Sequence, residues 1–285
     1  MLELKARAPA KINLALDVLG KRPDGYHELR MLMQSVSLYD ELTLSLLPEG
    51  GAAAASSNRP DLPRDDRNLA LRAARLFLGR TGRGEWGCSV HINKKIPVSA
   101  GLGGGSSDAA AVLRALNAHF ENPIPQNTLM GWALELGSDV PFCLRGGLCL
   151  AEGRGERLTP LPPLPDCRFV LCTPPISIST AAMYERIDSH PPKHRPDWPG
   201  LESAMAGGDL AAFARLLYNV FEPLQIKQGA ISEIRRVILG SGAPGAVMSG
   251  SGPTVVGIFA DDEKAEAARA ALAAAYADTF VCKGV

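Results

Sequence analysis

The segment from Pro97 to Ser107, PVSAGLGGGSS, combines residue types that can bind an anion. Its four glycines and the two serines after them lie between a β-rich run and an Ala-rich run of helical character. Consecutive glycines let backbone N–H groups point into one concavity, and a helix that begins at Ser106 and Ser107 presents unpaired N–H groups and its positive dipole end. Each dipole contact stabilises an anion by about 0.3–1 kcal/mol. Several together could hold a triphosphate.

The spacing of this segment differs from that of two common phosphate-binding motifs. A Walker loop requires a lysine after its last glycine, but Ser106 follows Gly105 here. A dinucleotide fingerprint that began at Gly101 would require a glycine at Ser106. A structural alternative stays open, in which Ser106, Ser107 or Asp108 caps a helix and the glycines only allow close packing.

The elements that must position this segment alternate along the chain. In the first half, residue patterns predict strands at 11–18, 31–47 and 88–96, helices at 67–80, 109–119 and 127–137, a surface loop at 50–67, and a loop running into paired strands at 138–153. In the second half they predict strands at 168–174, 246–260 and 279–285, helices at 179–188, 209–219, 229–241 and 262–277, and a proline-rich loop at 189–200. The pattern predicts an α+β protein. Clustered prolines near residue 160 suggest two domains, 1–160 and 161–285.

Composition excludes several classes of protein. The 285 residues are 46% apolar, enough for a large core. The 30 basic and 30 acidic side chains cancel, so there is no global basic surface for a nucleic acid. No apolar run approaches the roughly 18 residues of a membrane span, and charges and a proline interrupt the N-terminal residues, unlike a signal peptide. Six scattered cysteines without a CxxC pair are typical of a reduced protein. We therefore expect a cytoplasmic protein without nucleic-acid or membrane partners.

Several motifs resemble those of one enzyme family. PVSAGLGGGSSDAA resembles the nucleotide loop P-x-x-x-G-L-G-[SG]-[SG]-[SA] of the GHMP small-molecule kinases. APAKINLALDVLGKRPDGYHEL, LGSDVPFCLRGG and GAVMSGSGPTVVGIF resemble the branch of that family that acts on a cytidine-diphosphate derivative of methylerythritol. These motifs span nearly the whole chain in the family's order. The resemblance implies an N-terminal nucleotide-binding lobe, a smaller C-terminal α/β-sandwich lobe, and an active site in the cleft between them.

The resemblance also implies an ATP site. Without a Walker lysine, charge compensation would come from the helix dipole, a magnesium ion and lysines from elsewhere in the fold. The implied ATP-binding residues are Pro97, Val98, Ser99, Ala100, Gly101, Leu102, Gly103, Gly104, Gly105, Ser106 and Ser107, with Asn68 and Lys94 near the adenine. Asn68 is alternatively a helix N-cap, and Lys94 is alternatively a solvated residue at a strand end.

Two further residues match the family's catalytic positions. Phosphoryl transfer to an alcohol needs positioning, charge neutralisation and a proton acceptor for the hydroxyl. The resemblance assigns the acceptor role to Asp139, which precedes Pro141 in a predicted loop. It assigns Lys11 as the cation that keeps Asp139 ionised and lowers the cost of forming an alkoxide. From the residues alone, Asp139 is more typical of a local cap and Lys11 of a solvated surface lysine.

The acceptor pocket must bind a cytidine diphosphate and a branched polyol. Stacking contributes about 1–3 kcal/mol per base. The resemblance places Asn13, Tyr26, His27, Thr180 and Tyr184 at this substrate. It also places a second glycine-rich loop near the phosphates, formed by Ser249, Gly250, Ser251 and Gly252. Tyr184 is alternatively a core residue of an amphipathic helix, and this loop is alternatively a hairpin-like turn at a sheet edge.

The activity implied is ATP-dependent phosphorylation of the 2-hydroxyl of 4-diphosphocytidyl-2-C-methyl-D-erythritol, in the non-mevalonate (MEP) route to isoprenoid precursors. Mg²⁺ is expected with the nucleotide, and no protein metal site is predicted. A mevalonate, homoserine or sugar kinase of the same family is an alternative, but those acceptors lack a pyrimidine for RPDGYHEL to bind. A catalytically silent ATP sensor and a nucleic-acid-binding module are further alternatives, which the Lys11 and Asp139 positions and the zero net charge disfavour. The sequence indicates no oligomeric state.

Overall fold

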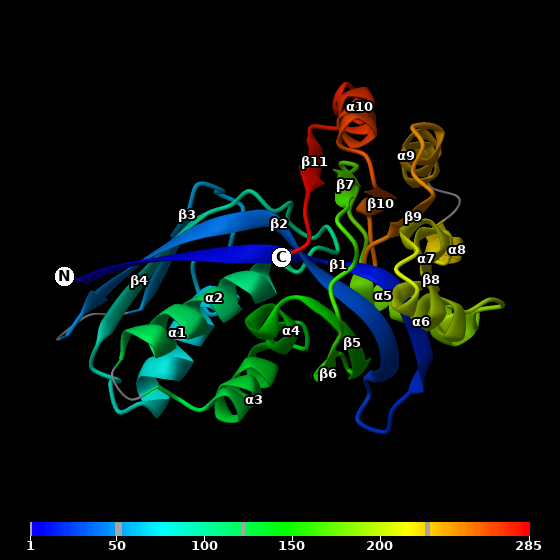
Figure 1. The fold of residues 1–285 in the computed structure, drawn as a ribbon. Coiled ribbons are helices and arrows are strands. Elements are labelled where there is room, and N and C mark those ends of the chain that lie inside the picture. Colours follow the sequence, from blue (N-terminus) through cyan, green and yellow to red (C-terminus); the bar gives the residue numbers. More distant parts are fainter. Residues whose placement is uncertain (1, 49–52, 121–122, 226–228) are drawn as a thin grey trace. The chain divides into compact units, whose positions relative to one another are not determined.

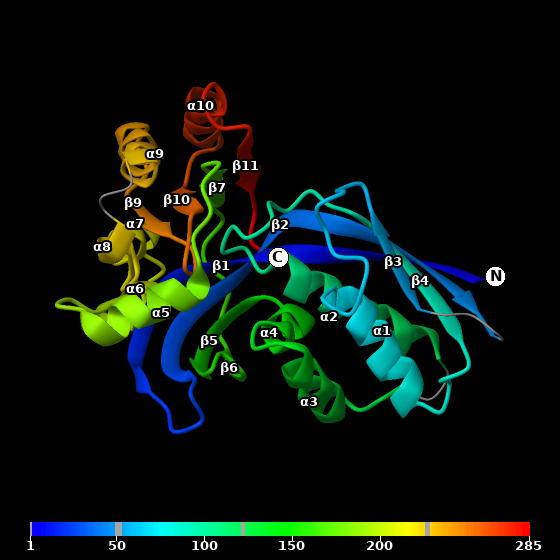
Figure 2. The same ribbon diagram turned by 180° about the vertical axis from the view of Figure 1, so that it is seen from behind.

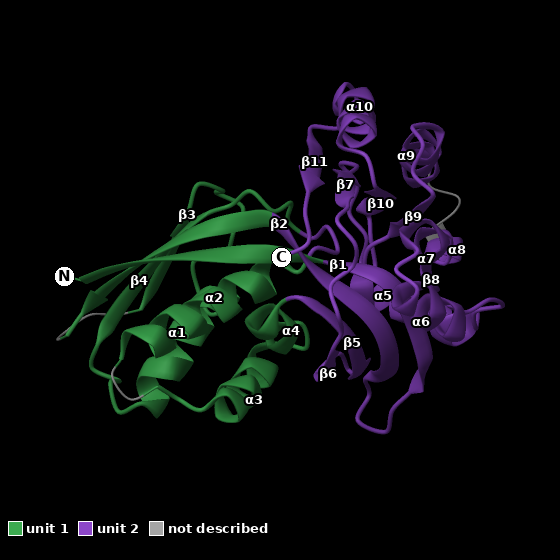
Figure 3. Ribbon diagram, in the orientation of Figure 1, with its two compact units in different colours: residues 1–11, 38–98, 103–146 green, residues 12–37, 99–102, 147–285 purple. Residues whose placement is uncertain are grey.

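The computed structural model describes residues 2–48, 53–120, 123–225 and 229–285, and the chain forms two compact units (Figures 1 and 3). Unit 1 comprises residues 1–11, 38–98 and 103–146, and unit 2 comprises residues 12–37, 99–102 and 147–285. The strands β1 (Leu2–Lys21) and β2 (His27–Leu47) contribute residues to both units. The two units are defined by contacts between residues, and each combines separate stretches of the sequence. They therefore do not test the predicted domains, 1–160 and 161–285, which stay a prediction.

Unit 1 is a sheet covered by helices. Residues 41–47 of β2 pair antiparallel with β4 (Gly87–Asn93), and β3 (Ala54–Ser57) pairs parallel with β4. The helices are α1 (Leu69–Arg80), α2 (Gly104–His119), α3 (Gln126–Leu136) and α4 (Val140–Arg145). Figures 1 and 2 show them on one side of these strands. Alternate β2 side chains, at Leu42, Leu44 and Leu46, are fully buried, as expected for the face of a strand that packs on helices.

Unit 2 contains two groups of paired strands. Residues 29–34 of β2 pair antiparallel with β5 (Leu148–Gly153), which pairs in turn with β6 (Arg157–Pro160), while β8 (Tyr218–Asn219) pairs parallel with β1. A separate antiparallel sheet has the order β11 (Asp278–Cys282), β7 (Arg168–Thr173), β10 (Val255–Phe259), β9 (Gly245–Met248). Helices α9 (Gly229–Gly240) and α10 (Asp262–Ala273) pack on this sheet. The unit also contains α5 (Thr180–Ser189), α6 (Trp198–Ala206), α7 (Leu210–Arg215) and α8 (Glu222–Gln225).

Most predicted elements are confirmed, and the errors are local. The predicted loop at 50–67 contains β3, whose pairing with β4 is a tertiary contact that local composition does not reveal; residues 50–52 lie outside the described part. The predicted loop after residue 137 contains α4, with a proline in its first turn, a position that a helix tolerates well. Helix α6 begins inside the predicted proline-rich loop for the same reason. The predicted strand at 246–260 is a hairpin of β9 and β10, and the predicted helix at 209–219 ends early and leads into β8.

Candidate active site

Lys11 and Asp139 form an ion pair in unit 1. The Lys11 ammonium, on β1, lies 3.5 Å from Oδ2 of Asp139. The Lys11 side chain is 7% exposed and the Asp139 side chain is 33% exposed. The structure therefore brings together the two residues that the sequence assigned to catalysis. The Lys11 ammonium thus lies beside a carboxylate that solvent can reach.

The backbone around Asp139 leaves its carboxylate available. Asp139 immediately precedes α4 and has helical dihedral angles, and Cys143 donates its backbone N–H to the Asp139 carbonyl. Within the described ranges, the Asp139 side chain makes no capping hydrogen bond to the start of α4. The Asp139 side chain therefore does not act as the local cap of the alternative. Its carboxylate faces Lys11 instead.

The glycine segment begins a helix, as predicted, but earlier. Helix α2 starts at Gly104, and its N-cap Gly103 has φ +66°, a left-handed conformation that favours glycine. The first intrahelical bond runs from the Ser107 N–H to the Gly103 carbonyl, so the N–H groups of residues 104–106 precede it. Among the described residues no side chain caps this helix, and the Ser107 hydroxyl donates to the Pro9 carbonyl instead. The helix start is thus available to an anion, and the capping alternative does not apply.

Gly103 also makes room for Lys11. A Cβ at Gly103 would lie 2.8 Å from Cγ of Lys11, inside any normal contact distance. The aliphatic stem of Lys11 therefore packs against the backbone at the start of α2 and is held close to it. The glycine at position 103 therefore does allow close packing, as the structural alternative proposed. This packing does not exclude an anion at the start of α2.

Residues 99–102 belong to unit 2, where they pack against the second glycine-rich loop. The Ser249 hydroxyl donates to the Gly101 carbonyl at 3.0 Å, and the Thr254 N–H donates to the Ala100 carbonyl at 3.3 Å. Gly101 has φ +78°, and a Cβ there would collide with the Ser249 carbonyl oxygen. The two glycine-rich segments are therefore in direct contact within unit 2.

The loop at 249–252 connects β9 to β10, as the turn alternative predicted, and contacts predicted substrate residues. The Asn13 N–H donates to the Ser249 hydroxyl at 3.1 Å, and the hydroxyls of Thr180 and Ser251 are 2.8 Å apart. Asn219 supports the loop, since its amide group donates to the carbonyls of Met248 and Gly250 at 2.7 Å. The hairpin turn thus gathers Asn13, Thr180 and residues 99–102 into one region of unit 2.

A cluster of aromatic rings lies beside α5. The His27 and Tyr184 rings stack with centroids 4.5 Å apart, and the Tyr184 and Phe221 rings form a T-shaped pair. His27 is buried, whereas Tyr26 is 49% exposed under the Arg154 guanidinium, which lies 3.5 Å from its ring centroid. The structure therefore joins His27 to Tyr184 and directs Tyr26 to solvent. Tyr184 is half-buried and packs on His27 and Phe221, which is compatible with a core position as well as with a substrate role, so its role stays a prediction.

Asp188 is a residue of this cluster that the sequence analysis missed. Its Oδ1 is 2.8 Å from Nε2 of His27, and its Oδ2 is 3.2 Å from the Lys21 ammonium. The hydrogen bond from His27 lowers the pKa of Asp188. Asp188 follows Tyr184 by one helical turn, and residues four apart share a helix face. The four-residue spacing from Tyr184 is the feature of the sequence that could have indicated Asp188.

Asn68 and Lys94, predicted near the adenine, have protein partners of their own. The Asn68 side chain accepts from the N–H groups of Ala70 and Leu71 and therefore caps α1, which is its structural alternative. Lys94 is not solvated: its ammonium contacts Asp40 at 2.5 Å and Asp108 at 2.9 Å. Their roles at a nucleotide stay a prediction.

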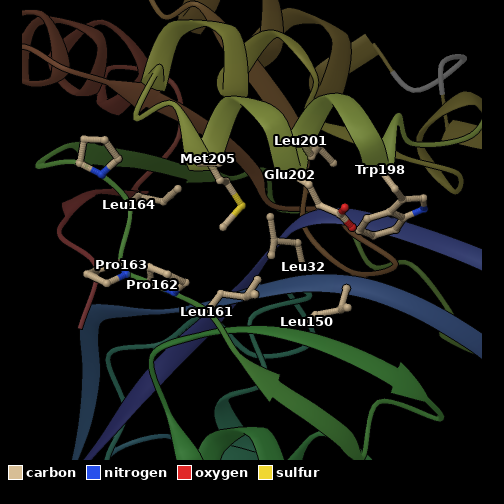
Figure 4. A pocket seen from close by; sticks show the side chains of 12 residues that line it. Leu32, Leu150, Leu161, Pro162, Pro163, Leu164, Trp198, Leu201, Glu202 and Met205 are labelled. Carbon is tan, nitrogen blue, oxygen red and sulfur yellow. The ribbon is translucent and has the colours of Figure 1, made fainter.

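An apolar pocket elsewhere in unit 2 contains none of these residues (Figure 4). It has a volume of about 240 Å³ and is lined mainly by aliphatic and proline side chains from α6 and from the segment between β6 and β7, including Leu161, Pro163, Leu201 and Met205. Its walls carry little polarity. This pocket does not suit a polyphosphate, and it plays no part in the site described here.

Three further features relate to the predictions about thiols, metal sites and membrane spans. Each of the six cysteines is buried and carries a free thiol. Within the described ranges, no three His, Cys, Asp or Glu side chains gather in a way that could hold a metal ion. Among the helices that the structure describes, none has the length and apolar character needed to span a membrane.

Comparison with known proteins first defines the class. Residues 68–147 match the N-terminal domain of the GHMP kinases, and residues 201–278 match the GHMP kinase C-terminal domain. A crystal structure of homoserine kinase from Cytophaga hutchinsonii superimposes with a TM-score of 0.77 over 99% of this chain and 94% of that chain, at 21% identity. These matches confirm the predicted α+β GHMP kinase fold.

More similar proteins narrow the family. The chain is 46% identical over 263 residues to the 4-diphosphocytidyl-2-C-methyl-D-erythritol kinase of Pelotomaculum thermopropionicum, covering 92% of this chain and 91% of that protein. It is 42% identical over 264 residues to the enzyme of the same name from Lachnospira eligens, with the same coverage. A crystal structure of 4-(cytidine 5'-diphospho)-2C-methyl-D-erythritol kinase matches with a TM-score of 0.83 and 34% identity over 99% of both chains. The chain therefore belongs to the 4-diphosphocytidyl-2-C-methyl-D-erythritol kinase family of GHMP kinases.

Proposed function

We propose that this protein transfers the γ-phosphoryl group of ATP to the 2-hydroxyl of 4-diphosphocytidyl-2-C-methyl-D-erythritol, a step of the MEP route to isoprenoid precursors. The observation that carries the proposal is the 3.5 Å pair of buried Lys11 and accessible Asp139 in a chain of this family. Kinases of this kind need few covalent steps from the protein, so a base, a cation and a phosphate cradle suffice. An enzyme that acts on such water-soluble substrates is expected in the cytoplasm.

The reaction assigns a role to each catalytic residue. The substrate hydroxyl attacks the γ-phosphorus, its proton passes to the Asp139 carboxylate, and the bond from the γ-phosphorus to the bridging oxygen breaks to release ADP. A positioned base of this kind contributes about 10²–10⁴-fold to the rate. Lys11 offsets the negative charge that develops on the attacking oxygen, and its packing against Gly103 fixes the direction of its ammonium group.

The nucleotide would be bound by backbone groups. We assign the triphosphate to the glycine segment 97–107, in which the N–H groups of residues 104–106 and the positive end of the α2 dipole favour anions. Mg²⁺ would arrive with the nucleotide, because this ion is held largely by substrate phosphates and water and needs few protein ligands. It would neutralise phosphate charge when bound.

The acceptor would be bound by the aromatic cluster of unit 2. Tyr184 and His27 present rings against which a cytosine can stack, and Asp188 fixes the His27 ring through Nε2. Asn13 and Thr180 lie near the 249–252 loop and would contact the polar part of the acceptor. Tyr26, which is exposed, would cover the base from the solvent side.

A substrate panel tests the proposal. The purified protein should release ADP and form a phosphomonoester, visible by ³¹P NMR, with the cytidine substrate and not with mevalonate, homoserine or a sugar. His27→Ala should raise the KM for the cytidine substrate and leave the KM for ATP unchanged. ADP release with another acceptor of the panel, or with none, would refute the assignment.

The alternative acceptors have weaker support. Solved structures of mevalonate and homoserine kinases resemble this chain at 13–21% identity, a level that shows the fold alone. The aromatic cluster around His27 and Tyr184 favours a planar base, which those acceptors lack. The cytidine substrate is therefore preferred.

A further inference from the structure

Three ionisable side chains are buried together next to the start of α2. The Lys94 ammonium, just after β4, lies 2.5 Å from Oδ2 of Asp40 on β2 and 2.9 Å from Oδ2 of Asp108 on α2. The Lys94 and Asp108 side chains are each 4% exposed and the Asp40 side chain is 0% exposed. All three residues belong to unit 1. We refer to them as the buried triad.

The buried triad connects three segments of backbone. The other carboxylate oxygen of Asp40 accepts the N–H groups of Lys95 at 2.6 Å and Ile96 at 2.9 Å, immediately before the glycine segment. Asp108 lies in the second turn of α2, immediately after that segment. The ammonium of Lys94 thus ties the residues before the glycine segment to the residues after it.

Gly104, the first residue of α2, packs directly on this lysine. A Cβ at Gly104 would lie 2.9 Å from the Lys94 ammonium nitrogen and 3.2 Å from a methyl carbon of Ile96. The position of the first helical turn is therefore coupled to the position of the Lys94 ammonium. Any shift of the lysine would therefore move the first turn of α2 and its N–H groups.

The buried triad is not expected to contribute much to the free energy of unfolding. Burying charges costs several kcal/mol per ion, and replacing a buried ion triad by apolar residues is often neutral or stabilising. Oδ1 of Asp108 is also buried and has no hydrogen-bond partner within the part of the chain that the structure describes. Burial raises the pKa of Asp108 to about 7, against the opposing effect of Lys94. A role in stability alone does not account for this arrangement, whereas a fixed geometry at α2 does.

We propose that the buried triad of Asp40, Lys94 and Asp108 positions the first turn of α2 for the phosphates of ATP, and that Lys94 acts through Asp108 as a positioning residue. The inference rests on the proposed function, because it takes the start of α2 as the triphosphate site. It differs from the assignment of Lys94 to the adenine, which requires an accessible ammonium group. The ammonium of Lys94 already contacts two carboxylates and is shielded from solvent.

Two variants separate the positioning role from direct contact with the nucleotide. Lys94→Met removes the charge and keeps the length of the side chain, leaving two carboxylates without their cation. It should weaken ATP binding by about 10- to 100-fold, the effect of a misplaced site. Lys94→Met with Asp108→Asn removes one carboxylate charge as well, so it should recover much of that loss. The matched control is Lys95→Met, because Lys95 is 46% exposed and its ammonium contacts Glu41 and the Tyr39 ring, neither of which belongs to the triad.

The measurements are ATP affinity by calorimetry and backbone hydrogen exchange across residues 103–109. The proposal expects faster exchange in this turn in Lys94→Met, recovery of both affinity and protection in the double variant, and no change in Lys95→Met. If the double variant regains protection but binds ATP as weakly as Lys94→Met, Lys94 contacts the nucleotide directly and the proposal is wrong. Unchanged exchange in Lys94→Met would also overturn it.

The same experiment distinguishes a failure of the proposed function. A wild-type chain that binds no ATP would refute the kinase assignment, whatever the variants do. The exchange data would then still decide whether the triad holds the start of α2. A wild-type chain that binds ATP, with no difference between Lys94→Met and Lys95→Met, would refute the positioning role alone.

Discussion

Unit 1 contains two lysine–aspartate clusters, and they differ in almost every physical respect. In the buried triad, Lys94 lies 2.5 and 2.9 Å from two carboxylates that are almost wholly excluded from solvent. In the second cluster, Lys11 lies 3.5 Å from Asp139, whose side chain is 33% exposed. The nitrogen–oxygen distances of the first cluster are short and its side chains are closed to solvent. The distance in the second cluster is longer, and its carboxylate is open to solvent.

The difference indicates which cluster can do chemistry. A carboxylate that must accept a proton needs access to the substrate hydroxyl. Asp139 is accessible in this sense, because its side chain neither caps α4 in the described structure nor lies in a closed ion cluster. The triad instead fixes backbone segments, since Asp40 accepts two backbone N–H groups as well as the lysine. Residue type alone does not separate these roles; burial and spacing do.

The largest expected effect comes from the open cluster. Asp139→Asn keeps the shape of the side chain but removes the proposed base, so kcat should fall by about 10²–10⁴-fold. ATP affinity should stay close to wild type, because the proposed triphosphate site is formed by the glycine segment and not by this side chain. Steady-state kinetics and calorimetry check this. Wild-type turnover in Asp139→Asn would show that the open cluster is not catalytic.

The second prediction concerns the cation of the same cluster. Lys11→Met keeps the aliphatic stem that packs on Gly103 and removes the charge near the reacting oxygen, so kcat should fall by about 10²–10³-fold. The matched control is Lys5→Met, an exposed lysine on the same strand, which should retain wild-type kinetics. A loss of ATP affinity with unchanged kcat in Lys11→Met would contradict this prediction, because Lys11 would then bind the nucleotide and not take part in catalysis.

The sequence predicted the open cluster better than the buried one. Lys11 and Asp139 came from family motifs, and the structure brings them together as that resemblance implied. The sequence places Lys94 near the adenine or in solvent, because the residues around it, NKKIP, do not show that two carboxylates distant in sequence contact one lysine. Asp40 and Asp108 lie 54 and 14 residues from Lys94, and only tertiary packing closes such distances. The same limitation hid the pairing of β3 with β4.

The third prediction tests the charge state of the triad. Asp108 has a folded pKa of about 7 against an ordinary value of 3.8, so the folded state favours its protonated form. This contribution to stability is fully present below pH 3.8 and is lost as the pH rises through 7. The charged and titratable groups near it are Lys94, Asp40 and the Cys143 thiol, whose own pKa is raised mainly by burial.

Asp108→Asn removes this titration and should therefore flatten the pH dependence. Between pH 5 and 8 the wild-type free energy of unfolding should fall relative to Asp108→Asn by on the order of 2 kcal/mol. Urea unfolding at four pH values measures the difference. Parallel curves for the two proteins would mean that Asp108 is ionised throughout, and the triad would then carry a full negative charge.

The smallest predicted effect separates two neighbouring glycines at the start of α2. A Cβ at Gly105 has its nearest contact at 4.0 Å, to Leu69, whereas a Cβ at Gly104 lies 2.9 Å from the Lys94 ammonium. Since alanine is the better helix former, Gly105→Ala should stabilise the protein by about 0.5–1 kcal/mol. Gly104→Ala should gain nothing or destabilise, because the added methyl group displaces a lysine that two buried carboxylates hold. Chemical denaturation of the two variants compares them directly. Equal stabilisation would mean that the ammonium moves aside at no cost, and a lysine that moves so easily could not position the turn.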